Sequence, residues 1–160
     1  MKNKLIKTSV SLEEYIPLKI LIDRDDEPVT HLSCFKETTS LLDISVGMTT
    51  GFIKRITLVS SKEYYITDGE LIIDNYEIGD LKVGNKLQNS CSCFKTYLHR
   101  NGIRIVISPV KASKYIKMDK LYVGLSTSDC IVEICICQLS SNEINHTKRE
   151  LDYEQAVYKS

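Results

Sequence analysis

Hydrophobic and polar residues alternate with a period of two over several stretches of this 160-residue chain. In residues 42–46 the order is Leu-Asp-Ile-Ser-Val, which is the pattern of a strand with one face buried. Residues 47–51 begin and end with glycine and can form a short connection, because glycine accepts positive φ values. Residues 52–59 then return as a second strand. The pattern therefore predicts a β-hairpin over residues 41–59.

Four further stretches show strand and hairpin patterns. A strand is predicted over residues 15–22, and three hairpins over residues 63–73, 97–107 and 120–139. The first of these hairpins turns at Asp68-Gly69 and the second at Asn101-Gly102, pairs that favour tight hairpin turns. The third turns through residues 126–129. Successive hairpins are typical of an antiparallel sheet that is twisted or folded over on itself.

The composition agrees with a β-rich fold. The chain has 19 Ile, 10 Val and 11 Thr but only two Ala, and β-branched side chains fit a pleated sheet better than a helix. Short helical patterns occur only near the ends, over residues 9–14 and 142–158, and residues 141–160 are predicted to be a surface helix or a flexible tail. We expect a single α+β domain over residues 1–160, dominated by antiparallel hairpins with few terminal helices.

The sequence predicts a cytoplasmic protein without a membrane segment. Its longest stretch without a charge has ten residues, 44–53, whereas a membrane-spanning helix needs about 20. The N-terminal lysines flank only two apolar residues, which is too short for a signal-peptide core.

Six cysteines are present, and a reducing compartment makes a disulfide framework an unexpected use for them. Cys91/Cys93 and Cys135/Cys137 form two C-x-C pairs, each with both thiols on one face of a strand. Two such strands side by side could hold zinc, but structural zinc sites usually use C-x2-C knuckles. Since Cys135 and Cys137 lie among apolar residues, buried thiols are favoured over a metal site or a disulfide.

Recognisable catalytic motifs are absent: the sequence has no G-x-S-x-G, no phosphate-binding Gly-Lys loop, no H-E-x-x-H and no G-x-G-x-x-G. Its histidines are His31, His99 and His146. His99 lies in a basic hairpin, so a small metal-independent ribonuclease using His99 remains an alternative. The main prediction is that the protein is not an enzyme and uses no cofactor or metal.

The zero net charge conceals two opposed segments. Residues 63–80 contain three tyrosines and six acids but no Lys or Arg: Glu63, Tyr64, Tyr65, Asp68, Glu70, Asp74, Tyr76, Glu77 and Asp80. Residues 82–120 contain nine basic residues and one acid, Asp119. Such asymmetry indicates charged partners.

Three interpretations of this asymmetry remain open. Strands of the two segments could pair in one sheet and neutralise each other. The acidic segment could instead bind a basic protein surface, with carboxylates steering the partner and tyrosines supplying contact area. The basic segment, interleaved with Phe94, Tyr97 and Tyr115, could hold a nucleic-acid backbone, although no nucleic-acid-binding motif is present.

Residues 42–59 also resemble a hairpin of small bacterial immunity proteins, which are encoded beside contact-dependent growth inhibition or other polymorphic toxins. The resemblance rests on Leu-Asp-Ile-Ser-Val-Gly, the Thr-Gly turn at 50–51, and Phe-Ile-Lys-Arg-Ile-Thr-Leu-Val. It implies a protein without catalytic residues that binds a toxin domain, often a nuclease, and covers its active site. No site residue is transferred from that family.

The charge pattern and the resemblance lead to the same expectation. A protein that neutralises a nuclease should present negative charge where the phosphates of the substrate would otherwise lie. We therefore expect a cognate toxin domain as the partner. The predicted interface comes from the acidic segment: Tyr64, Tyr65, Asp68, Glu70, Asp74, Tyr76, Glu77 and Asp80. A nucleic-acid-binding module that uses residues 82–120 is the first alternative, and the sequence leaves the oligomeric state open.

Overall fold

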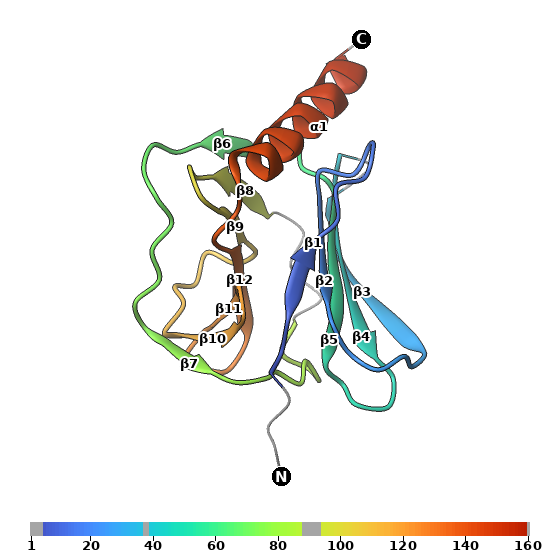
Figure 1. The fold of residues 1–160 in the computed structure, drawn as a ribbon, viewed down its shortest axis with the longest axis vertical. Helices are drawn as coiled ribbons and strands as arrows, with labels where there is room; N and C mark the ends of the chain where they lie inside the picture. Colours follow the sequence, from blue (N-terminus) through green and yellow to red (C-terminus); the bar gives the residue numbers. More distant parts are fainter. Residues whose placement is uncertain (1–4, 37–38, 88–93, 160) are drawn as a thin grey trace.

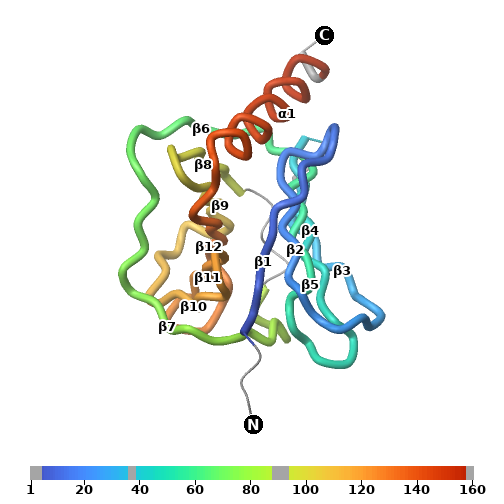
Figure 2. Tube along the Cα trace, viewed as in Figure 1, coloured from blue at the N-terminus to red at the C-terminus, as the bar shows by residue number. Residues whose placement is uncertain are grey.

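The structure, a computed structural model, describes residues 5–36, 39–87 and 94–159. Two β-sheets pack face to face, and one helix lies across the end of the sandwich that is opposite the N-terminus (Figure 1). The path of the chain in Figure 2 shows that the first sheet is built from the N-terminal third of the sequence and the second from the remainder.

The first sheet has five strands in the order β1-β2-β5-β4-β3, all antiparallel. The strands are β1 (Thr8–Val10), β2 (Leu18–Ile22), β3 (Val29–Lys36), β4 (Ser40–Gly47) and β5 (Ile53–Ser60). The predicted hairpin 41–59 is confirmed as β4 and β5. Gly51, at the end of its turn, has a φ of 77°, a value that glycine adopts without strain.

The second sheet has seven strands in the order β6-β8-β9-β12-β11-β10-β7. The strands are β6 (Tyr64–Ile66), β7 (Tyr76–Ile78), β8 (Lys95–Leu98), β9 (Ile103–Val106), β10 (Lys114–Met118), β11 (Leu121–Leu125) and β12 (Ile131–Ile136). The hairpins predicted at 97–107 and 120–139 are confirmed as β8–β9 and β11–β12. The two edge strands run parallel to their neighbours, β6 to β8 and β7 to β10.

The hydrophobic core lies between the sheets. Alternate residues of β2, β4 and β5 face the other sheet and are almost fully buried, among them Ile20, Ile44 and Ile56. They belong to one cluster with residues of the second sheet such as Ile105 and Ile134. Burying apolar surface at roughly 25 cal/mol per Å² makes this shared core the main stabilising contribution.

Helix α1 (Ser141–Lys159), the one α-helix among the described residues, joins the two sheets at one end. Ser140 accepts a hydrogen bond from the backbone N–H of Glu143, and Glu143 accepts one from the N–H of Ser140, which is a capping box. Buried Leu151 anchors the helix in the core, and Thr147 donates a hydrogen bond to the carbonyl of Pro17. The described part of the chain contains no helix with the length and hydropathy that a membrane crossing requires.

Three sequence predictions are wrong in detail. Residues 63–73 do not form a hairpin, because β6 pairs with the distant strand β8 and residues 70–73 form no strand. The short helix predicted at 9–14 is absent, since Thr8–Val10 pairs with β2 as a strand. The strand predicted from residue 15 begins at Leu18, after a turn in which Tyr15 has a φ of 68°.

Candidate protein interaction site

The acidic segment forms an extended connection across the outer face of the seven-stranded sheet. β6 and β7 are consecutive in sequence but occupy opposite edges of that sheet, so residues 67–75 must cross its full width. We call these residues the strap (Figures 1 and 2, green). Six strand intervals of about 4.8 Å amount to roughly 29 Å. The ten residue steps from Ile66 to Tyr76 reach at most about 33–36 Å. The strap is therefore close to its maximum extension.

The first end of the strap is fixed by the β8–β9 turn. The backbone N–H of Thr67 donates to the carbonyl of Leu98 at 2.8 Å. The N–H of Leu71 donates to the side-chain oxygen of Asn101 at 2.7 Å. Gly102 lies directly beneath, where a Cβ atom would come within 3.0 Å of the Leu71 side chain. The predicted Asn-Gly turn therefore shapes a hairpin and also seats the strap.

The second end of the strap is fixed by β10. The side-chain N–H of Asn75 donates to the carbonyl of Ser113 at 2.8 Å, and the N–H of Tyr115 donates to the carbonyl of Asn75 at 3.2 Å. These groups lead directly into β7, which continues along β10. Hydrogen bonds at both ends thus hold an otherwise irregular segment against the sheet.

The strap alternates inward and outward side chains like a strand. Leu71 and Ile73 pack on the outer face of the sheet, whereas Glu70, Ile72 and Asp74 are exposed. The inward side chains cover a small second core made of Tyr122, Cys135 and Cys137, with Tyr115 at its margin. The strap therefore buries part of the face that would otherwise be open to water.

A buried carboxylate lies on this covered face. Glu133 of β12 is 5% exposed and accepts two hydrogen bonds from Arg104, at 2.6 and 3.1 Å. It also accepts the hydroxyl of Tyr115 at 3.0 Å and the thiol of Cys135 at 3.2 Å. The bond to Glu133 raises the pKa of Arg104, while burial and Glu133 raise the pKa values of Tyr115 and Cys135. This arrangement favours a fixed ion pair with neutral neighbours and provides no free acid or base.

Four predicted acids lie on the outer surface of the strap and of β7. Asp68, Glu70, Asp74 and Glu77 are exposed, and within the described residues none of them forms an ion pair. The backbones of the acidic and basic segments do pair, β7 with β10 and β6 with β8, but these four side chains are not neutralised by that pairing. Their charge is therefore available to a partner.

Large apolar side chains accompany these acids. Five side chains between residues 65 and 78 are 40 to 80% exposed: Tyr65, Ile66, Ile72, Tyr76 and Ile78. Tyr65 stacks on Tyr97 with ring centroids 5.3 Å apart, and Tyr76 meets the ring of Tyr122 edge-on at 5.6 Å. Exposed apolar groups concentrated in one segment mark a surface for binding.

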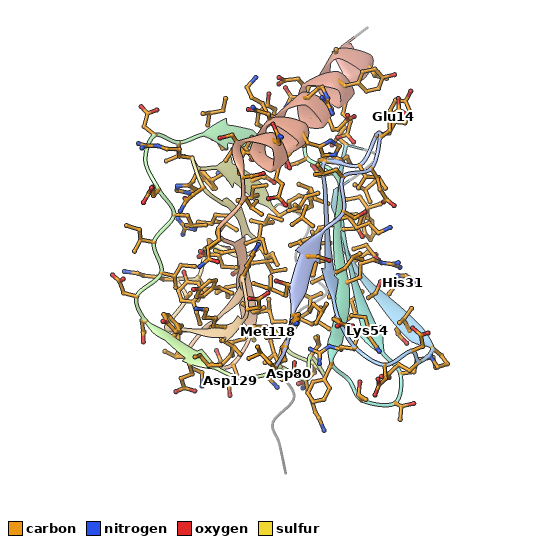
Figure 3. All side chains as sticks on the ribbon, viewed as in Figure 1. Glu14, His31, Lys54, Asp80, Met118 and Asp129 are labelled. Carbon is orange, nitrogen blue, oxygen red and sulfur yellow. The ribbon has the colours of Figure 1, made fainter. Side chains whose placement is uncertain are left out.

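Two of the predicted interface residues have partners within the fold. Tyr64 is half-buried, and its hydroxyl donates to Asp152 of α1. Asp80 accepts two hydrogen bonds from Arg24, both at 2.5 Å, at the end of the sandwich opposite α1 (Figure 3). The structure thus brings Tyr65, Asp68, Glu70, Asp74, Tyr76 and Glu77 onto one exposed strip and places Tyr64 and Asp80 in structural contacts at its two ends.

The Arg24–Asp80 pair lies in a cleft of about 1010 Å³ between the sheets. The guanidinium of Arg24 also donates to the carbonyl of Ile53 at 2.7 Å and lies 5.0 Å from the centre of the Phe52 ring. Glu27 accepts hydrogen bonds from the backbone of Thr50 and Thr49, which lower its pKa to about 2. The charged groups of this cleft therefore have partners within the fold: Arg24 binds Asp80, and Glu27 binds the turn between β4 and β5.

The basic segment 82–120 does not form a comparable surface for bases. Phe94 is buried, the ring of Tyr97 stacks on Tyr65, and Tyr115 packs partly buried against the core around Tyr122, so none of these rings is freely exposed for base stacking. Arg104 is paired with Glu133, and the Nζ of Lys117 lies over the Tyr76 ring at 5.0 Å.

The buried cysteines of the described residues differ in their chemical state. Cys135 and Cys137 carry free thiols on the covered face, as expected for buried cysteines, and burial raises the pKa of Cys137 to about 11. Cys34, buried on β3, is disulfide-bonded, so the expectation of reduced thiols throughout is wrong there. Cys91 and Cys93 lie outside the described residues. Among those residues, no group of three or more His, Cys, Asp or Glu could hold a metal ion.

The histidines lie on separate elements, and in the described structure none bonds to another. His99 follows β8; burial and the neighbouring Arg104 lower its pKa, and no described residue forms a hydrogen bond with its Nδ1. His146 on α1 contacts the carbonyl of Ile16 at 3.0 Å. His31 on β3 completes a group that the sequence did not suggest, with Asp43 and Ser45.

The three side chains Ser45, His31 and Asp43 do not form a catalytic relay. Both partners contact the same ring nitrogen, His31 Nδ1, at 3.2 Å for Ser45 and 2.9 Å for Asp43. A relay needs the base between its two partners, one on each nitrogen. Ser45 is also only 1% exposed on a sheet face. The group could have been predicted from the sequence once β3 and β4 were recognised as paired strands. His31 lies opposite Ser45, and Asp43 is two positions from Ser45 on β4, so the three side chains share one face.

Comparison of the chain with known protein families found no matching family, and comparison with curated proteins found no similar sequence.

Proposed function

We propose that this protein is a stoichiometric inhibitor that binds the basic surface of a cognate bacterial toxin domain, with a nuclease as the expected class of toxin. The observation that supports the proposal is the exposed strip along the strap and β7. The strip contains four acids, none of which forms an ion pair within the described residues. It also contains the exposed side chains of Tyr65, Ile72 and Tyr76.

Each component of this strip has a physical role in such a complex. A nuclease binds phosphates through Lys and Arg, so carboxylates along an extended strap can compete for those groups. Exposed charges mainly accelerate association, whereas buried apolar and aromatic contacts slow dissociation. Anchoring at both ends of the strap lowers the entropy lost when it is bound.

The test is a charge reversal with a matched control. The strap variant combines Asp68→Lys, Glu70→Lys and Asp74→Lys, and the control combines Glu14→Lys, Asp23→Lys and Asp26→Lys, which makes the same charge change at other exposed positions. The partner is recovered from the host with the tagged wild-type chain. Its enzymatic activity and its association rate are then measured against each variant at several salt concentrations.

We expect the wild-type chain to inhibit the partner's activity at a one-to-one ratio. The strap variant should associate at least about tenfold more slowly and lose most of the salt dependence, because steering by these carboxylates is removed. The control should retain wild-type inhibition. Equal inhibition by the two triple variants, or a partner whose activity the wild-type chain leaves unchanged, would contradict the proposal.

A further inference from the structure

The four edge strands of the sandwich differ in length. β1, β6 and β7 each contain three residues, whereas β3 contains eight. Proteins commonly shorten their edge strands because a row of unpaired N–H and C=O groups can bind another strand. Three edges of this fold follow that rule and β3 does not.

β3 also lacks most of the other features that protect an edge. It pairs with β4 over eight consecutive positions without a register shift, so no bulge twists it away. It contains no proline, and apart from the disulfide-bonded Cys34 its ionisable residues are His31 and, at its last position, Lys36. Phe35 is 61% exposed beside this edge.

The hydrogen-bond pattern shows which groups face outward. The N–H of Met48 donates to the carbonyl of Pro28 at 2.8 Å, which makes residues 28 and 48 a hydrogen-bonded pair. Since such pairs alternate along an antiparallel ladder, the even-numbered residues of β3 bond to β4. The odd-numbered ones direct N–H and C=O to the open edge: Val29, His31, Ser33 and Phe35. No described residue bonds to these groups from that side.

We propose that β3 pairs antiparallel with β3 of a second copy of this chain, so that two five-stranded sheets become one sheet of ten strands. A two-fold axis at Leu32 places Val29 opposite Phe35 and His31 opposite Ser33. This register pairs all the outward N–H and C=O groups of Val29, His31, Ser33 and Phe35 in each chain. A two-fold axis perpendicular to the strands, as here, makes the two strands antiparallel and the interface self-complementary.

The strand is suited to pairing with itself. The chain has no net charge, and the proposed register places no like charges opposite each other, which would weaken a cross-strand pair. It also covers the exposed ring of Phe35 with Val29 of the partner, and aromatic and β-branched side chains form favourable cross-strand pairs. The strap lies on the other sheet and stays accessible, so this proposal is independent of the proposed function.

The test measures the mass of the chain in solution by light scattering and sedimentation, over protein concentrations from about 1 to 500 μM. Ser33→Pro removes one outward N–H and leaves the β3–β4 ladder intact, since proline is tolerated where its nitrogen faces away from the sheet. Ser33→Ala is the matched control, because it loses the same hydroxyl bond to Asp43 but keeps the N–H.

We expect the wild-type chain and Ser33→Ala to have twice the 18.2 kDa mass of one chain, and Ser33→Pro to dimerise at least about tenfold more weakly. Phe35→Lys, a change to an exposed side chain, should also weaken the dimer and serves if Ser33→Pro fails to fold. A monomeric wild-type chain over the whole concentration range would overturn the proposal. So would a dimer that Ser33→Pro and Phe35→Lys leave unchanged.

Discussion

The outer faces of the two sheets differ in how they meet the solvent. In the five-stranded sheet, β2 alternates buried and half-buried residues, and the outward side chains include polar Asp43, Thr57 and Lys19. In the seven-stranded sheet, β11 and β12 are buried at every position. The strap accounts for much of this difference, because Leu71 and Ile73 cover the face on which Cys135 lies.

This difference has an energetic consequence. The outer face of the five-stranded sheet is not covered by a strap, and we call it the bare face. A polar group that remains in contact with water there gains little net free energy from its hydrogen bonds. A polar group under the strap has lost that water and depends on its protein partners. Glu133, whose side chain is 6% exposed, should therefore matter more to folding than Asp43, whose side chain is 19% exposed, although both accept hydrogen bonds in cross-strand networks.

The largest expected effect is the loss of the buried carboxylate. Glu133→Gln should lower the free energy of unfolding by about 2 kcal/mol, because it removes the charge of a buried carboxylate that accepts several hydrogen bonds, while water partly compensates Arg104, whose side chain is 41% exposed. Asp43→Asn, the matched change on the bare face, should cost less than about 1 kcal/mol. Urea denaturation of both variants measures the difference. Equal losses would show that the strap does not desolvate the face beneath it.

A smaller effect should follow from loosening the strap itself. Leu71→Ala should lower the free energy of unfolding by about 1–2 kcal/mol, since it removes a partly buried side chain that seats the strap on Gly102. Ile72→Ala should change it by less than about 0.5 kcal/mol, because that side chain is exposed. Both variants can be compared by urea denaturation and by amide hydrogen exchange over residues 67–75.

The same pair of variants gives a second observable. Labelling of Cys135 by a thiol reagent, followed by mass spectrometry of its peptide, should be faster in Leu71→Ala than in Ile72→Ala. Cys135 is fully buried beneath the strap in the native fold. Identical labelling rates would mean that the thiol is protected by the sheet alone and that the strap adds no cover.

The sequence predicts the elements whose contacts are local. The hairpins β4–β5, β8–β9 and β11–β12 follow from alternation within each strand and from turn residues between paired strands. The continuous apolar run of β12, interrupted only by Glu133, is typical of a strand buried on both faces. The ion pair between Glu133 and Arg104 of β9 could have been predicted once β12 and β9 were recognised as neighbouring strands.

The strap could not be predicted in the same way. Asp68-Gly69 does bend the chain, with Gly69 at a φ of 97°, but β6 pairs with β8 about 30 positions further along the chain. Turn residues predict pairing between strands that adjoin the turn, and they carry no information about a partner strand so far along the chain. The charge pattern located the acidic segment, yet it could not show that Tyr64 is bound to Asp152 of α1, 88 positions away.

The smallest expected effect concerns how each sheet holds its connecting segment. The strap is fixed by backbone and amide groups that do not titrate, whereas the β4–β5 turn is fixed by the carboxylate of Glu27. Hydrogen bonds from Thr50 and Thr49 lower the pKa of Glu27 from 4.5 to about 2 in the folded protein. Its stabilising contribution is therefore complete above about pH 4.5 and is lost as the pH falls towards 2.

Amide exchange at residues 47–52, corrected for intrinsic rates, should rise over this interval in the wild-type chain. Glu27→Gln should exchange faster at every pH and show no such rise, while residues 67–75 remain unchanged. If the strap loosened together with the turn, acid would be acting on the whole sandwich and the contrast between a titrating and a non-titrating anchor would fail.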